Sequence, residues 1–273
     1  MSETEIPNVT PAEGLAVLHL FYQINHGAWE EFLPEEQAKA KQALADLVAE
    51  ANAREGCTAY TFAMFGKADL GFMILDADVQ ALNALEKKIR LALGTDVLET
   101  EFTYLSMTER SEYTTTEEQY RKQLVEEEGL AEGTPELDSK LAEFRVRIEK
   151  YGKYRLYPEL PRWECFCFYP MSKRRHPGQN WYAADFETRK ALMGGHARVG
   201  RRYAERIKQL VTGSTGLDDW EWGVTLFAHD PFDIKAIVYE MRFDEVSHQY
   251  AEFGPFYNGL TLELPAIYER LGL

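Results

Sequence analysis

Cysteine is scarce in this chain of 273 residues. Its three cysteines, Cys57, Cys165 and Cys167, lack the spacing of a zinc site. Cys165 and Cys167 lie two apart in an apolar run, so a strand would place both thiols on one face. We interpret these cysteines as buried thiols of a protein in a reducing compartment.

Long apolar runs and excess positive charge are also missing. No stretch approaches the roughly 20 apolar residues of a membrane helix, and residues 1–11 lack the pattern of a signal peptide. The 30 Lys and Arg face 45 Asp and Glu, a net charge of −15, which argues against binding phosphates of nucleic acid. We therefore expect a soluble, cytoplasmic protein with neither membrane nor nucleic-acid partners.

Several catalytic signatures are absent as well. The chain has no phosphate-binding glycine loop, Walker motif, zinc cluster or Gly-x-Ser-x-Gly elbow. Its six histidines are scattered, without a pair at i, i+4 spacing, which argues against a metal site built from several histidines. A single histidine can still ligate an iron that a porphyrin already holds. The six are His19, His26, His176, His196, His229 and His248.

The first half of the chain alternates between strand and helix patterns. Buried-strand composition, helical spacing of Ala and Leu, and a glycine-containing hairpin predict the order β-α-β-β-α-β, the ferredoxin-like arrangement. The predicted strands cover 15–24, 58–65, 70–75 and 97–105, and the predicted helices cover 34–54 and 79–93.

The second half repeats this order. Strands are predicted at 164–171, 211–217, 221–228 and 253–260, and helices at 186–207 and 231–241. The sequence thus predicts an α+β fold of two tandem ferredoxin-like halves that form a dimeric α+β barrel. We divide it into an N-terminal half, 12–108, an acidic connector, 109–154, and a C-terminal half, 155–273.

The connector carries 12 acidic residues, and its middle, 129–135, shows no periodicity. A connector of this length is unusual in a compact domain and often serves as a lid or binding loop. A solvated linker explains the same composition, and both interpretations stay open.

His196 is the best candidate for an iron ligand. It follows Gly194 and Gly195 inside the predicted helix 186–207. Two helical glycines cost roughly 1 kcal/mol each relative to alanine. A bulky flat object packed against that face is one reason to tolerate them, whereas a merely half-buried histidine is the plainer alternative.

Two further segments contain candidate pocket residues. Tyr169 stands near the end of a predicted strand, two residues before Met171 and four before Lys173, so all three can face one pocket. Arg242 lies between Met241 and Phe243. If it is buried it needs a partner, which an anionic ligand would supply. Core packing and a solvated basic loop explain the same residues without a ligand.

Together these segments resemble a known family. The motifs are YPMSKRR at 169–175, NWY at 180–182, the Gly-His helix, GSTGLDDWEWGVTLF at 213–227, EMRFDEVS at 240–247 and AEFGPF at 251–256. In this order they resemble the coproheme decarboxylases of the chlorite dismutase-like superfamily. The resemblance is dense from 155 to 260 and rests on element order in the first half. It implies a homopentamer that binds iron coproporphyrin III (coproheme) in the C-terminal half.

The resemblance also implies a reaction. Hydrogen peroxide drives the oxidative decarboxylation of two propionates to vinyl groups, giving heme b through a monovinyl intermediate, with coproheme as substrate and redox centre. His196 matches the proximal iron ligand, Tyr169 the radical-forming tyrosine, and Lys173 the lysine beside the reacting propionate. Other matched positions line the porphyrin or anchor its propionates: Met171, Arg155, Arg242, Ser247 and, in the connector, Tyr113.

Gln209 matches the distal glutamine of this branch, above the open face of the iron. Chlorite dismutases place an arginine there. A neutral amide can bond a peroxide but offers no positive charge to an oxyanion, which disfavours chlorite chemistry. The connector departs from the family, which usually carries an asparagine and a tyrosine near a propionate where this chain has Ser111, Glu112 and Tyr113. Tyr113 can keep the contact, but Glu112 would repel a carboxylate if it pointed inward. A contact with coproporphyrin ferrochelatase is implied by the pathway. A heme carrier or sensor and a heme peroxidase or chlorite dismutase are the alternative functions.

Overall fold

The first half of the chain folds in the predicted order. The computed structural model describes residues 7–273, so most of the segment 1–11 examined for a leader lies outside them. Asn25 caps α1, Pro34 opens α2 at its first turn, and Asp78 caps α3. The elements are β1 (Ala16–Ile24), α1 (His26–Glu30), α2 (Pro34–Ala53), β2 (Cys57–Met64), β3 (Leu70–Asp76), α3 (Val79–Ala92) and β4 (Leu98–Thr108).

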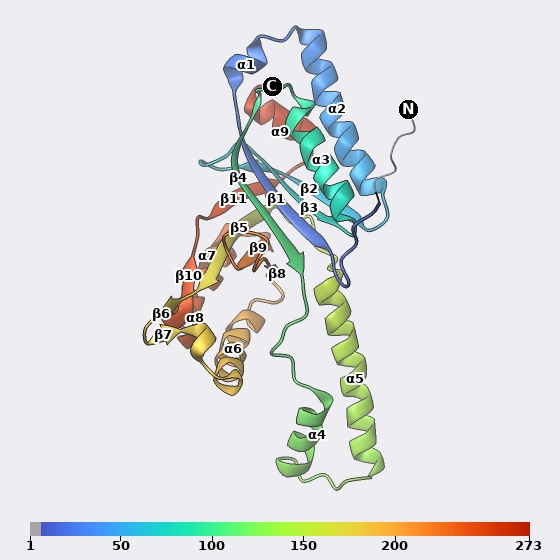
Figure 1. The fold of residues 1–273 in the computed structure, drawn as a ribbon, viewed down its shortest axis with the longest axis vertical. Coiled ribbons are helices and arrows are strands. Elements are labelled where there is room, and N and C mark those ends of the chain that lie inside the picture. The colour runs from blue at the N-terminus through green and yellow to red at the C-terminus, as the bar shows by residue number, and fades with distance from the viewer. Residues whose placement is uncertain (1–6) are drawn as a thin grey trace.

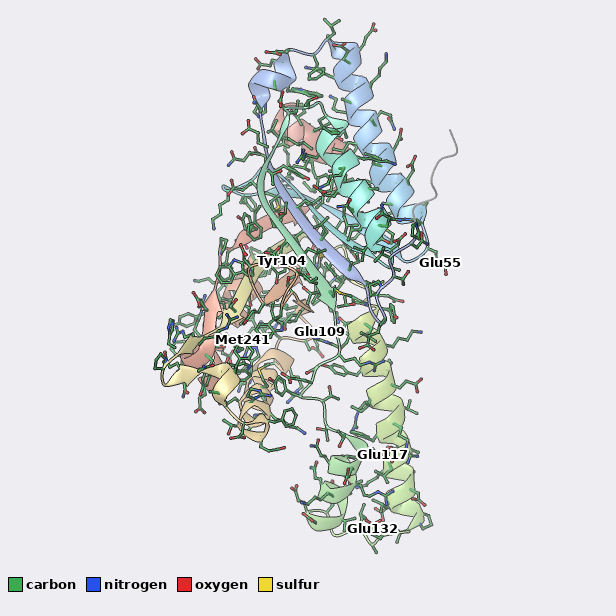
Figure 2. The ribbon with its side chains drawn as sticks, viewed as in Figure 1. Glu55, Tyr104, Glu109, Glu117, Glu132 and Met241 are labelled. Atoms are coloured by element: carbon green, nitrogen blue, oxygen red, sulfur yellow. The ribbon has the colours of Figure 1, made fainter. Side chains whose placement is uncertain are left out.

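The connector forms a helical hairpin that extends away from the body of the molecule (Figure 1). Thr116 caps α4 (Glu117–Glu126) and Thr134 caps α5 (Pro135–Leu156). A small core of Leu124, Leu137 and Leu141 joins the two helices. Figure 2 shows Glu117 and Glu132 on this hairpin and Glu109 at its base. The predicted boundary between connector and second half therefore falls inside α5.

The second half also contains the predicted elements, with two shifted boundaries. The helix predicted at 186–207 ends at 201, because residues 202–206 form turns and Ile207 already pairs with Ala228. The strand predicted at 211–217 accordingly runs over 207–213, and the strand predicted at 253–260 is two strands. The elements are β5 (Cys165–Lys173), β6 (Arg175–His176), β7 (Gln179–Asn180), the 3-10 helix η1 (Trp181–Ala183), α6 (Phe186–Arg201), β8 (Ile207–Gly213), β9 (Trp222–Ala228), α7 (Pro231–Met241), α8 (Glu245–Tyr250), β10 (Ala251–Phe253), β11 (Tyr257–Thr261) and α9 (Leu264–Leu271).

Apart from the short β6–β7 pair, the strands of the described residues join into one antiparallel sheet that closes on itself. Its order is β10-β5-β11-β2-β3-β1-β4-β8-β9, and β9 also pairs with β5. The two halves meet where β11 pairs with β2 and where β4 pairs with β8. The α+β class is thus confirmed, and eight strands form a closed ring with β10 attached to β5.

Aromatic side chains fill the inside of this ring. One core cluster draws residues from all eight ring strands, among them Phe21, Tyr104 and Phe168. His19 is fully buried with them and stacks on Phe168 at 4.0 Å between ring centroids. Its Nε2 lies 2.9 Å from Thr225 Oγ1, and burial lowers its pKa to about 3, so this histidine is neutral at physiological pH.

Helices cover the outer faces of the ring in two groups (Figure 1). Helices α2, α3 and α9 pack against the first half and share one core with it. Helices α6, α7 and α8 lie over the second half. Among the described residues, no helix is long and apolar enough to cross a membrane.

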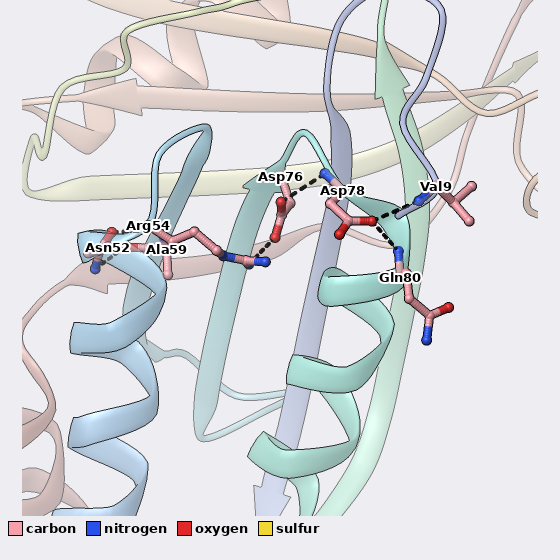
Figure 3. Close-up of polar contacts among 7 residues, drawn as sticks. All are labelled: Val9, Asn52, Arg54, Ala59, Asp76, Asp78 and Gln80. Carbon is pink, nitrogen blue, oxygen red and sulfur yellow. Dashed lines mark hydrogen bonds and ion pairs between the residues drawn. The ribbon is translucent and has the colours of Figure 1, made fainter. Parts of the chain in front are cut away.

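The turn between β3 and α3 ties down the start of the described chain. Buried Asp76 forms an ion pair with Arg54 and accepts a hydrogen bond from the backbone N–H of Asp78 (Figure 3). The Asp78 carboxylate in turn accepts from the N–H groups of Val9 and Gln80, both at 3.0 Å. These contacts join the start of the described chain to the first half of the molecule.

Candidate functional site

Four of the predicted site residues lie on the face of the sheet that α6–α8 cover. Side chains alternate along a strand, and Cys167 and Ile207 belong to the core cluster on this face. The same alternation places Tyr169, Met171 and Lys173 of β5 on this face. It also places Gln209 of β8 there, two residues after Ile207. The structure therefore brings residues from β5 and β8 into one layer, although Gln209 lay outside every predicted strand.

His196 on α6 is held by a carboxylate from the loop between α7 and α8. Its Nδ1 lies 2.9 Å from Oδ2 of Asp244, the N-cap of α8. Asp244 also accepts hydrogen bonds from the backbone N–H (3.0 Å) and the hydroxyl (2.9 Å) of Ser247. Burial alone would raise the pKa of Asp244, but its bonds to His196 and Ser247 lower it on balance. Because Asp244 engages Nδ1, Nε2 is the nitrogen left to bind a metal.

Helix α6 is unusual because none of its residues, all described, is buried. A surface helix normally buries an apolar stripe, yet Leu192, Met193 and Val199 remain partly exposed. At Gly194 an added Cβ would meet no atom within 4 Å. The helix that carries His196 thus leaves its packing incomplete.

Tyr169 lies deeply buried among aromatic rings. Its ring stacks on Phe256 at 4.5 Å between centroids and lies 5.9 Å from the ring of Phe253. Burial raises its pKa above the usual value, although the nearby Arg242 lowers it slightly. The guanidinium of Arg242 stands 3.7 Å from the centroid of Phe253, which connects this arginine to the tyrosine.

Two pockets flank this aromatic group. The first, about 410 Å³, is lined by Arg242 and Ser247 together with Phe253 and Phe256. The second, about 370 Å³, is more apolar and shares Arg242 and Phe256 with the first. Arg242 and Ser247 therefore face a cavity, as an anchor for an anionic group requires.

Lys173, at the end of β5, is mostly removed from water. Its Nζ lies 4.7 Å from the centroid of the Trp181 ring. Burial lowers its pKa to about 8, although the carboxylates of Asp244 and Glu221 oppose this effect. Lys173 can therefore gain or lose a proton near neutral pH.

Arg155 lies near the end of α5, and Tyr113 precedes α4. Arg155 Nε donates to the carbonyl oxygen of Glu109 at 3.2 Å, at the base of the hairpin. Tyr113 packs against Phe186, at 6.0 Å between centroids. Burial raises the pKa of Tyr113 to about 12, with a further contribution from Glu112. Glu112 also lies 4.0 Å from Arg189, so its charge has a cation beside it.

The chain has relatives with this architecture. A family model described as chlorite dismutase matches residues 37–262. The chain belongs to the chlorite dismutase family. A coproheme decarboxylase from Oceanobacillus iheyensis is 35% identical over 97% of this chain and 98% of its own length. A heme-binding protein from Thermus thermophilus has a similar structure, with a TM-score of 0.79, 34% identity and coverage of 98% and 99% of the two chains.

More distant members share the fold. A chlorite dismutase from Candidatus Nitrospira defluvii superposes with a TM-score of 0.71 at 18% identity, over 96% of this chain and 97% of the other. A relative from Natronomonas pharaonis is 38% identical over 92% of this chain. Its name assigns it to the heme-binding proteins by inference. This chain spans only 40% of that archaeal protein's length.

Three residues that contact the candidate site residues were not predicted. Asp244 contacts His196, and Trp181 and Glu221 contact Lys173. Asp244 stands three residues before Ser247, a spacing typical of a helix N-cap, and so had a local signal. Trp181 and Glu221 come into contact with Lys173 only when the chain folds, so no local sequence pattern indicates them.

Proposed function

We propose that this chain is a coproheme decarboxylase, which converts iron coproporphyrin III to heme b with hydrogen peroxide. The observation that carries the proposal is the layer between α6 and the sheet. It holds His196, backed by Asp244, together with Tyr169 and Lys173. The identity with the Oceanobacillus iheyensis coproheme decarboxylase, over nearly the full length of both chains, supports it.

The residues of the layer fit an iron porphyrin. Helix α6 leaves its inward side chains incompletely packed, and Gly194 faces open space, as a flat ligand would require. His196 would hold the iron through Nε2, with Nδ1 oriented by Asp244. The guanidinium of Arg242 would hold a carboxylate in the pocket that it lines with Ser247, whose hydroxyl can donate to that carboxylate only by releasing Asp244. When bound, the ferric porphyrin supplies the redox chemistry with peroxide.

The other residues act on the propionate that reacts. Tyr169 is buried and keeps its phenolic proton. If it gives up one electron together with that proton, it becomes a neutral tyrosyl radical. Lys173, with its pKa of about 8, can hold the propionate carboxylate as a cation and exchange a proton. Fixing one edge of the porphyrin against Tyr169 selects which propionate reacts, and such orientation is worth several kcal/mol.

Gln209 separates this function from chlorite chemistry. Its position on β8 places a neutral amide on the same face as Tyr169. An amide can donate to a peroxide oxygen but supplies no charge to chlorite. Decarboxylation is therefore favoured over oxygen release from chlorite. Homopentameric assembly, a cytoplasmic location and transient contact with coproporphyrin ferrochelatase stay predictions from the family resemblance.

The test is to mix the purified protein with ferric coproheme, titrate hydrogen peroxide, and follow the porphyrin by chromatography with mass spectrometry. We expect two successive losses of CO2 plus two hydrogens, ending at heme b. Unchanged coproheme would contradict the proposal and favour a heme carrier. Oxygen release from chlorite would favour a chlorite dismutase.

Tyr169→Phe tests the residue that carries the reaction. We expect coproheme binding to remain and decarboxylation to be lost, because phenylalanine cannot supply the electron and proton. Tyr257→Phe is the matched control, since Tyr257 is equally buried but belongs to the core inside the ring. Turnover in Tyr169→Phe comparable with that of the control would remove Tyr169 from the mechanism.

A further inference from the structure

Glu221 is a buried carboxylate at a junction of three strands. It directly precedes β9, and only 3% of the residue is exposed. Its backbone N–H donates to the carbonyl of Met171 on β5 at 3.1 Å, and its carbonyl accepts from the N–H of Ser214, after β8, at 2.7 Å. A charge buried in this way is costly unless it is paired and hydrogen-bonded, so its partners matter.

The side chain of Glu221 joins the end of β5 to the segment that follows it. One carboxylate oxygen accepts the backbone N–H of Lys173 at 2.8 Å, and the other pairs with Arg175 on β6. Arg175 also lies 5.5 Å from the ring centroid of Tyr182 in η1. Burial raises the pKa of Glu221, but the Lys173 N–H, the Tyr182 hydroxyl and Arg175 together lower it on balance. Glu221 is thus a satisfied, charged anchor.

The charge of this anchor acts on the Lys173 ammonium. Glu221 and Asp244 are the two carboxylates that favour the charged form of Lys173 against burial, and Trp181 covers the amine. Arg175 follows Lys173 by two residues and neutralises part of the Glu221 charge. Asp244 also contacts His196, whereas the contacts of Glu221 converge on the Lys173 segment. Glu221 is therefore the carboxylate whose removal isolates the effect on Lys173.

We propose that Glu221 is a positioning residue, which fixes the end of β5 and keeps Lys173 protonated where it meets the substrate carboxylate. The catalytic consequence rests on the proposed function, because it assumes that Lys173 faces a propionate. The effect on Lys173 itself does not, since it arises from contacts within the chain.

The first experiment titrates Lys173 in the full chain without added porphyrin. Lysine side chains labelled with ¹³C are followed by NMR against pH, and Lys173→Arg assigns the signal. We expect the Lys173 midpoint to fall in Glu221→Gln, which keeps an acceptor for the Lys173 N–H but loses the charge. Glu221→Asp should retain most of the midpoint, and Asp219→Asn, which removes an exposed charge nearby, should leave it unchanged.

A second variant, expected to shift the Lys173 midpoint in the opposite direction, keeps the test decisive if Glu221→Gln does not fold. Arg175→Gln removes a side chain that is 65% exposed and leaves Glu221 less neutralised, so the Lys173 midpoint should rise. A midpoint that stays at the wild-type value in folded Glu221→Gln, or that fails to rise in Arg175→Gln, would overturn the proposal.

The second experiment measures decarboxylation of coproheme against pH. In Glu221→Gln we expect the alkaline limb of the pH–rate profile to move to lower pH and kcat near pH 8 to fall several-fold, with recovery in Glu221→Asp. A merely structural defect would lower activity at every pH without moving the limb, and would count against the proposal. If the wild type does not decarboxylate, the proposed function fails, while the NMR titration still decides whether Glu221 sets the charge of Lys173.

Discussion

The two halves of the ring carry helices in the same order, yet the helices pack on their strands differently. Helix α3 in the first half buries Leu82, Leu85 and Ile89. Its counterpart by order, α7, likewise buries three residues, whereas α6 buries none and its counterpart α2 buries Leu44 and Ala51. The contrast indicates that a duplicated architecture can assign stability to one half and ligand binding to the other. The first half completes its own core, whereas in the second half α6 has no buried residue and two pockets lie beside Phe256.

The largest expected effect, on the free energy of unfolding, tests how tightly the core of the first half is packed. Leu82→Ala should lower the free energy of unfolding by about 2–5 kcal/mol, because it removes a leucine that is only 2% exposed. Urea denaturation of the ligand-free protein measures this loss. Coproheme affinity of the folded variant should stay unchanged, and a loss under about 1 kcal/mol would contradict a fully packed first half.

A second, smaller effect concerns the free energy of unfolding that is lost by burying Lys173 in the second half. Its pKa is lowered from 10.5 to about 8. Between these two pH values the unfolded chain binds a proton that the folded chain does not, so the stability of the wild type should rise with pH. Below pH 8 the full loss of stability caused by burying the Lys173 ammonium, at most about 3.5 kcal/mol, is present.

Comparison with Lys173→Met isolates this contribution. The difference in unfolding free energy, wild type minus variant, should increase between pH 8 and pH 10.5 and stay constant below pH 7.5. Chemical denaturation at a series of pH values measures it. A difference that does not depend on pH would show that Lys173 is as well solvated as an exposed lysine.

The smallest change in stability should come from α6 itself. Leu192→Ala is expected to cost less than about 1 kcal/mol of ligand-free stability, because Leu192 is only partly buried. The same change should weaken coproheme binding several-fold, as followed by the Soret band, if the porphyrin completes the packing of α6. Leu91→Ala, at an exposed leucine of α3, should change neither quantity. Equal affinity in the two variants would place the ligand elsewhere.

Prediction from sequence worked best where the pattern was local and strong. The helix at 231–241 and the strands near 16–24 and 70–76 follow directly from apolar periodicity and Pro or Asp caps. It failed at 202–210, where helical composition continues past Arg201. Pairing of Ile207 with Ala228 overrides that propensity there. The connector helices were missed because their short apolar stripes are buried only against each other.

The sequence by itself determined the α+β class, the single-histidine candidate His196 and the spacing that puts Tyr169 and Lys173 on one strand face. These properties depend on periodicity and residue type along a short stretch of chain. Only the tertiary structure decided the closure of the ring through β5 and β9, the pairing of His196 with Asp244, and the burial of Glu221 beside Lys173. Each of these joins segments far apart in the chain, and burial, which sets the charge of Lys173, exists only after folding.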